Sequence, residues 1–144
     1  MTKDKMLFVI LRIAMGWIFL WAFLDKVFGL GFATTPEKSW LAGGSPTSGF
    51  LQFAPKGPFA GFYHALAGQP WVDWLFMLGL LALGISLILG LKVKLASYGG
   101  VALMILMYLA LIPPANNPII DEHIIYALVL LVLSRINVRD GQPS

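Results

Sequence analysis

Three ionisable residues stand together just before the last apolar segment of the chain. Asp121, Glu122 and His123 are consecutive, and Tyr126 follows three residues later. On a helix, residues three and four apart share a face, so Glu122, His123 and Tyr126 can point into one pocket. Carboxyl and imidazole groups are suited to general acid–base chemistry. Acids in a first helical turn also complement the helix dipole, so this cluster is interpreted either as a proton-handling site or as a helix start.

Basic residues follow one stripe of the first apolar segment. This stripe follows alternating spacings of four and three residues, and its members are Arg12, Gly16, Phe19, Phe23 and Lys26. Arg12 and Lys26 therefore share a helical face, about 20 Å apart along the axis. Charges inside a membrane span are costly and often functional, although each of these long side chains could also reach the nearer interface. We expect Lys26 to approach Asp121 or Glu122 and form a polar cluster at the outer mouth of a helix bundle.

The composition places these residues in a membrane protein. Of 144 residues, 58% are hydrophobic and 12% are charged, too few charges to cover a soluble domain of this size. The absence of cysteine excludes disulfides, thiolate metal sites and thiol redox chemistry. Two histidines are too few for a protein-built metal cage, so no metal site is predicted. The net charge of +3 comes without a basic run, which argues against nucleic-acid binding.

Four apolar segments are long enough to cross a bilayer as helices, which requires about 20 residues each. The predicted spans cover residues 6–30, 70–91, 93–112 and 118–136 of a single domain, 1–144. Pro70 and Pro118 suit the first helical position, and Asn117 can cap the last span. The very short turn around residues 92–94 makes the second and third spans antiparallel neighbours. The expected fold is an all-α integral membrane four-helix bundle.

Small residues indicate how the second and third spans pack. Ala82, Ser86 and Gly90 repeat every four residues, and Ala96 with Gly100 does so on the next segment. Such stripes let helix backbones approach closely in lipid. We expect these faces to form helix contacts.

The basic residues are distributed unequally between the two sides of the predicted bundle. With the N-terminus inside, seven lie on the cytoplasmic side and three outside, and five of the seven acidic residues are outside. The cytoplasmic set is Lys3, Lys5, Arg12, Lys92, Lys94, Arg135 and Arg139, and the outer set is Lys26, Lys38 and Lys56. The positive-inside rule then predicts that both termini are cytoplasmic. The expected location is the plasma membrane of a prokaryote.

The outer connection, residues 31–69, is long for a structureless loop. Thr35-Pro36-Glu37-Lys38 resembles a helix start that Gly43 and Gly44 would end, and residues 58–67 form a second apolar-faced segment. That face would carry Phe59, Phe62, Tyr63 and Leu66. We predict two short helices capping the bundle at the outer bilayer surface. His64 lies on the side of this helix opposite that face or at its edge, and both a lid and a plain interfacial cap fit the pattern.

Four stretches of the chain resemble the DoxX/DoxD family of small four-helix membrane proteins. The resemblance spans nearly the whole chain and is carried by residues 11–17 (LRIAMGW), 23–26 (FLDK), 43–50 (GGSPTSGF) and 117–123 (NPIIDEH). It implies a membrane subunit linked to redox metabolism. The named founding activity of that family oxidises thiosulfate to tetrathionate and passes the electrons to quinone, with a second, smaller subunit. Other members are tied to oxidative-stress assemblies.

On this hypothesis the polar residues divide into two roles. Glu122, His123 and Lys26 are the expected catalytic residues, with Glu122 or His123 handling quinol protons. The expected substrate- and quinone-binding residues are Arg12, Gly16, His64, Asp121 and Tyr126. Arg12, Lys26 and His64 would attract the sulfur anion. Quinone is the electron acceptor, and no haem or flavin motif is evident.

Other functions fit the same residues. The chain could be a membrane anchor for soluble redox or oxidative-stress enzymes, or a carrier of a small molecule or lipid with a charged mouth. Expected partners are the lipid bilayer, a second redox subunit or soluble redox enzymes. The sequence leaves the oligomeric state open, including a homo-oligomer.

Overall fold

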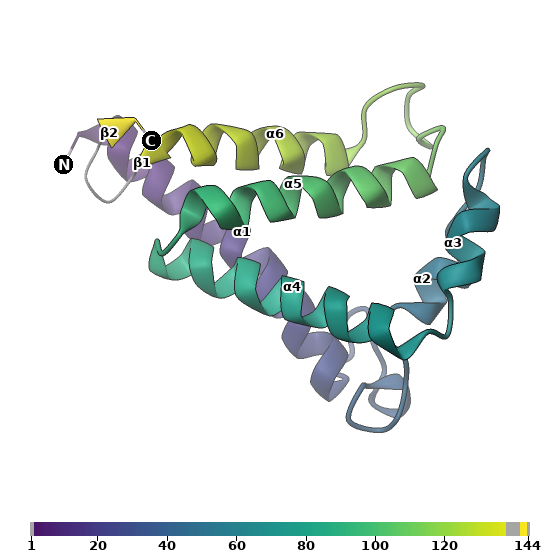
Figure 1. The fold of residues 1–144 in the computed structure, drawn as a ribbon. Coiled ribbons are helices and arrows are strands. Elements are labelled where there is room, and N and C mark those ends of the chain that lie inside the picture. The colour runs from purple at the N-terminus through teal and green to yellow at the C-terminus, as the bar shows by residue number, and fades with distance from the viewer. Residues whose placement is uncertain (1, 138–141, 144) are drawn as a thin grey trace.

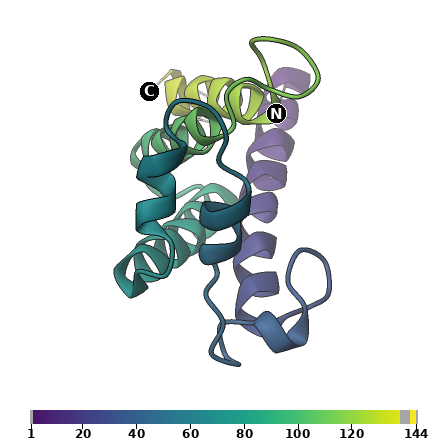
Figure 2. The ribbon, with the colours of Figure 1, turned by 90° about the vertical axis from the view of Figure 1, so that its right-hand side faces the viewer.

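The computed structural model describes residues 2–137 and 142–143 and is built mainly of helices (Figures 1 and 2). In chain order the elements are α1 (Lys3–Phe28), the 3-10 helix η1 (Pro36–Lys38), α2 (Ser48–Phe53), α3 (Ala60–Leu66), α4 (Pro70–Leu89), α5 (Val93–Ala110), α6 (Glu122–Arg135), β1 (Ile136–Asn137) and β2 (Gln142–Pro143). The two short strands pair antiparallel. Arg139, counted above as cytoplasmic, lies outside the described residues.

Three helices, α1, α4 and α5, are long and apolar enough to cross a membrane. They confirm the first three predicted segments as helices. The Thr2 side chain accepts a hydrogen bond from the backbone N–H of Lys5 and begins α1. Gly29 and Gly90, both with positive φ, end α1 and α4. Pro70 occupies the first turn of α4 as predicted, where its missing N–H costs nothing.

The fourth apolar segment forms a shorter helix than predicted. It begins at Glu122 instead of Pro118 and has 14 residues, so it extends about 21 Å at 1.5 Å per residue. The predicted cap at Asn117 is wrong, because the Asn117 Oδ1 accepts the N–H groups of Ile119 and Ile120 in a separate turn. Asp121 caps the helix instead. The described part of the chain therefore holds three helices that qualify as spans.

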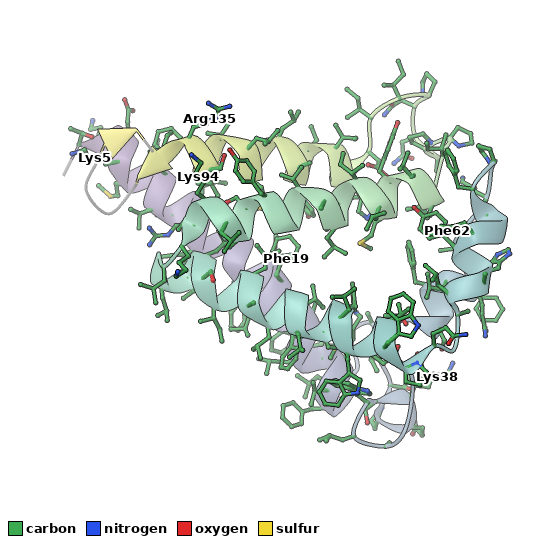
Figure 3. The ribbon with its side chains drawn as sticks, viewed as in Figure 1. Lys5, Phe19, Lys38, Phe62, Lys94 and Arg135 are labelled. Carbon is green, nitrogen blue, oxygen red and sulfur yellow. The ribbon has the colours of Figure 1, made fainter. Side chains whose placement is uncertain are left out.

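The long helices pack in sequence. α1 lies along α4, α4 contacts α5 at the tight turn joining them, and α5 lies along α6. α4 and α5 diverge away from that turn, and α2 and α3 lie across the far end (Figure 1). Lys5, Lys94 and Arg135 gather at the end that holds the turn and the N-terminus, whereas Lys38 lies at the opposite end (Figure 3). The predicted separation of basic residues between the two ends thus has a counterpart in the fold.

Glycines set the contact between α1 and α4. A Cβ added at Gly16 would lie 2.9 Å from the carbonyl oxygen of Gly84, and one added at Gly84 would lie 2.9 Å from the backbone nitrogen of Leu20.

The small residues predicted to form helix contacts do so only in part. The prediction is wrong for Ala82 on α4, because this residue is exposed. Gly100 on α5 does lie in a contact, since a Cβ there would be 2.8 Å from Leu130. Phe19 points into the interior between the helices (Figure 3).

The outer connection differs in part from its prediction. The first predicted helix is only the short η1, an unpredicted α2 follows it, and α3 matches the second predicted helix. The expected apolar face of α3 is divided. Tyr63 is buried against α5 and donates its hydroxyl to the carbonyl of Leu106, whereas Phe62 is 61% exposed. Burial raises the pKa of the Tyr63 phenol, so that hydroxyl stays a donor over a wide pH range.

Candidate functional site

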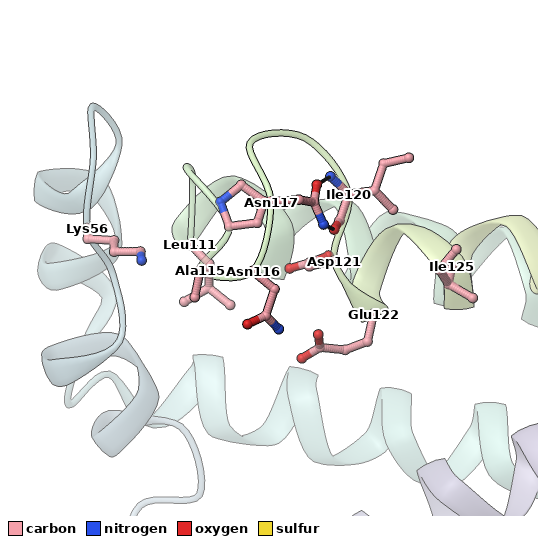
Figure 4. Close-up of a pocket in the computed structure, with 10 residues that line it drawn as sticks. Lys56, Leu111, Ala115, Asn116, Asn117, Ile120, Asp121, Glu122 and Ile125 are labelled. Carbon is pink, nitrogen blue, oxygen red and sulfur yellow. Dashed lines mark hydrogen bonds between the residues drawn. The ribbon is translucent and has the colours of Figure 1, made fainter.

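A pocket of about 390 Å³ lies at the end of the molecule covered by α2 and α3. Its walls come from the segment between α5 and α6, the first turns of α6, and one residue of the outer connection (Figure 4). The lining residues are Lys56, Leu111, Pro114, Ala115, Asn116, Asn117, Ile120, Asp121, Glu122 and Ile125. Polar groups therefore share this pocket with aliphatic walls, an arrangement typical of ligand sites.

Lys56 enters the pocket because its backbone is fixed to the end of α5. Its N–H donates to the carbonyl of Ala110 at 3.0 Å, satisfying one of the last carbonyls of that helix. The next residue, Gly57, has φ +88°, and a Cβ there would lie 2.2 Å from the carbonyl oxygen of Ile112. The backbone at 56–57 is thus pressed against the chain leaving α5. From the sequence Lys56 is predicted only to be one of the outer basic residues, and no local signal in the sequence marks it for the pocket.

Asp121 and His123 form a hydrogen-bonded pair at the start of α6. The Nδ1 of His123 lies 2.9 Å from Asp121 Oδ2, and the two side chains are 11% and 12% exposed. The other oxygen of Asp121 accepts the N–H groups of His123 and Ile124. Because an ionised carboxylate only accepts hydrogen bonds, Nδ1 of His123 donates the hydrogen of this bond.

Asp121 is therefore the helix cap of α6, with both carboxyl oxygens engaged in hydrogen bonds. Glu122 is exposed, lines the same pocket, and makes no hydrogen bond or ion pair within residues 2–137.

The three side chains Asp121, Glu122 and His123 also have the distances of a metal site. Their ligand atoms lie within 4.8 Å of one another. Both oxygens of Asp121 and the Nδ1 of His123 are, however, already engaged in capping hydrogen bonds. The geometry is explained by the helix cap, and we assign no metal to it.

Lys26 does not join this group. It stands in the last turn of α1, and the end of α1 is well separated from the start of α6 in two perpendicular views (Figures 1 and 2). Among the described residues it makes no ion pair with Asp121 or Glu122. The expected cluster of Lys26 with these acids is therefore not formed, because α1 packs along α4 and not along α6.

The remaining predicted site residues lie elsewhere. Arg12 is 6% exposed and its guanidinium packs against Gly90 at the end of α4. Gly16 is enclosed in the α1–α4 contact. His64 is exposed on α3, and Tyr126 packs against the main core. The three basic residues expected to attract an anion, Arg12, Lys26 and His64, are thus dispersed, and none of them lines the pocket.

Two buried acids had no predicted role as anchors. Asp25, 1% exposed, accepts hydrogen bonds from the N–H groups of residues 32–34. Asp73 on α4 accepts the hydroxyls of Ser45 and Thr47 at 2.7 and 2.6 Å. Both carboxylates fix the outer connection to the long helices. They serve the positioning of the cap rather than the pocket itself.

Comparison with known proteins gives no relative from which a role could be transferred: no family model, curated protein or solved structure matches the chain. The pocket must therefore be interpreted from its own chemistry. It offers an ammonium donor at Lys56, an acceptor at Glu122, and the amide of Asn116 between them (Figure 4).

Proposed function

We propose that this chain is a four-span membrane protein, with both termini cytoplasmic, that binds a quinone head in its outer pocket as a subunit of a quinone-linked redox system. The observation that carries the proposal is the placement of Lys56 and Glu122 on facing sides of one pocket (Figure 4). The resemblance to the DoxX/DoxD family supports the redox class. The cap α2–α3 would then lie at the outer bilayer surface.

The topology has physical support in the charge distribution. Lys5, Lys94 and Arg135 lie at one end of the helices, as the positive-inside rule requires of a cytoplasmic end. α6 would complete a fourth crossing together with the flanking segments 118–121 and 136–137. The Asn117 turn and the Asp121 cap supply hydrogen-bond partners for backbone groups that lipid could not satisfy.

The site chemistry fits proton-coupled reduction of a small ring. Lys56 can donate to one ring oxygen, and the carboxyl group of Glu122 can exchange a proton with the other. In the founding reaction of the resembled family, two thiosulfates lose one electron each and join through a new S–S bond to give tetrathionate. The quinone takes those two electrons with two protons and becomes the quinol. Within residues 2–137 no cysteine is present for the electrons to pass through, so the electron path lies between bound substrates or through the second subunit.

The activity test uses the purified chain in quinone-containing liposomes, alone and with its co-purifying partners. Thiosulfate should produce quinol and tetrathionate, and Glu122→Ala should reduce the rate at least about tenfold, the range for loss of a general acid–base group. Glu37→Ala is the matched control, because Glu37 is an exposed acid of η1 outside the pocket. Absence of bound quinone and of quinone reduction in every preparation would reject the proposal and favour an anchor or carrier.

The topology test exploits the lack of cysteine in the sequence. Single cysteines at Lys38→Cys and Lys94→Cys are each the only thiol in their variant. An impermeant thiol reagent added to intact cells should label the first and not the second. The reverse pattern, or labelling of both, would contradict the proposed orientation.

A further inference from the structure

We infer that the outer pocket binds the reduced, quinol form of its ligand more tightly than the quinone, with Glu122 as the residue that discriminates between them. This inference rests on the proposed function and concerns the same pocket. It follows from which groups of the pocket can donate hydrogen bonds and which can only accept them.

The donor side of the pocket is Lys56. An ammonium group carries three donors and no acceptor. It can therefore donate both to a quinone carbonyl oxygen and to a quinol hydroxyl oxygen. Its backbone anchor at Ala110 and the close approach of Gly57 to Ile112 hold the base of this side chain at the pocket wall. Lys56 makes no salt bridge within residues 2–137, although two carboxylates line the same pocket.

The acceptor side is Glu122. Asp121 is committed to the helix cap and to His123, so its oxygens are occupied. The exposed Glu122 carboxylate has no such partners among the described residues and, when ionised, can only accept. A quinone carbonyl facing it would place two acceptors against each other. A quinol hydroxyl in the same position donates to it in a charge-assisted hydrogen bond.

Asn116 does not remove this asymmetry. Its amide offers both donors and an acceptor and adapts to either form of the ring. Asn117, by contrast, is used by its own turn with Ile119 and Ile120. The discrimination therefore falls on Glu122, and Lys56 contributes to the affinity for both forms.

A redox consequence follows by linkage. The bound couple is quinone plus two electrons plus two protons giving quinol, and tighter binding of the quinol shifts this equilibrium toward reduction. A tenfold preference raises the potential of the bound two-electron couple by about 30 mV. The pocket would thus make the bound quinone a stronger oxidant toward a mild reductant such as thiosulfate.

The experiment measures binding of a short-chain 1,4-benzoquinone and of its dithionite-reduced quinol to the full chain in detergent, by anaerobic equilibrium dialysis. The wild type should prefer the quinol by about tenfold or more, as expected for one hydrogen bond to a charged group. Glu122→Gln, whose amide can also donate, should bring the ratio near one, and Glu122→Asp should retain the preference. Lys56→Met should weaken the binding of both forms. Lys38→Met, outside the pocket lining, should change neither.

The outcomes separate the two proposals. Equal binding of quinone and quinol by the wild type, or an unchanged preference in a folded Glu122→Gln variant, overturns this inference and leaves the proposed function standing. No binding of either form by the wild type overturns both. Circular dichroism of each variant establishes that it is folded before its affinity is compared.

Discussion

The guanidinium of Arg12 packs directly against Gly90, where an added Cβ would lie 2.8 Å from Arg12 Nη1. Gly90 ends α4 in the left-handed conformation, with φ 74°, and its N–H donates to the carbonyl of Ser86. The positive side chain thus lies at the negative end of the α4 dipole, a favourable position. This contact places Arg12 inside the helix packing, an alternative to the lipid interface that the sequence left open.

Substitution of Gly90 should therefore destabilise the protein. Gly90→Ala places a residue with a Cβ in the left-handed region, which costs about 1–2 kcal/mol of conformational free energy. It also displaces the Arg12 guanidinium. We expect a corresponding loss in the free energy of unfolding, measured by tryptophan fluorescence in detergent. Gly79→Ala in the same helix meets nothing within 4 Å and should be neutral or slightly stabilising. Equal stability of the two variants would contradict the assigned contact.

The α1–α4 crossing predicts a second glycine effect. Gly84→Ala brings a Cβ to 2.9 Å from Leu20 Cβ and backbone nitrogen, atoms that cannot move without the helix. The two helices must separate, and overpacking of this kind costs about 1–3 kcal/mol. Thermal unfolding in detergent should show the loss. Gly99→Ala on α5, with open space around it, is the control and should leave the midpoint almost unchanged.

The attachment of the outer connection to α4 can be tested at Asp73. Asp73→Ala leaves the hydroxyls of Ser45 and Thr47 without their acceptor. The loss of hydrogen bonds to a charged group should lower the free energy of unfolding by about 2 kcal/mol. Limited proteolysis should then cut residues 31–69 faster than in the wild type. Asp73→Asn keeps an acceptor oxygen and should be milder. A double-mutant cycle with Thr47→Val should show coupling, and strict additivity would argue against the bond.

The Asp121 cap predicts a loss of stability when its carboxyl group is removed. Asp121→Ala leaves the N–H groups of His123 and Ile124 without their side-chain acceptor, which should lower the free energy of unfolding by about 1 kcal/mol. Thermal unfolding in detergent should show this loss, and Asp121→Asn, which keeps an acceptor oxygen, should be milder. Asp4→Ala, at an exposed acid in the first turn of α1, is the control and should behave as the wild type. Equal midpoints for Asp121→Ala and the wild type would rule out this role.

Local signals predicted much of the helix framework. These signals are Pro70 at the start of α4, Gly90 at its end, and the turn around Lys92 and Lys94. Each one affects only the backbone within a few residues, so its effect can be inferred without the rest of the chain. The same reasoning located α3. It failed at the start of α6, because Asn117 and Asp121 are both good caps and only the folded turn decides which of them binds the helix N–H groups.

Hydropathy and chain direction thus determined three membrane-length helices and the antiparallel pairing of α4 with α5. The tertiary structure decided which polar residues meet. Asp73 finds its partners 28 and 26 residues away, and Lys56 reaches the pocket through a bond to Ala110. Lys26 stays apart from Glu122 because α1 and α6 pack on different neighbours. Periodicity along a helix predicts which residues share a face. Which other helix that face contacts depends on the packing of the whole chain.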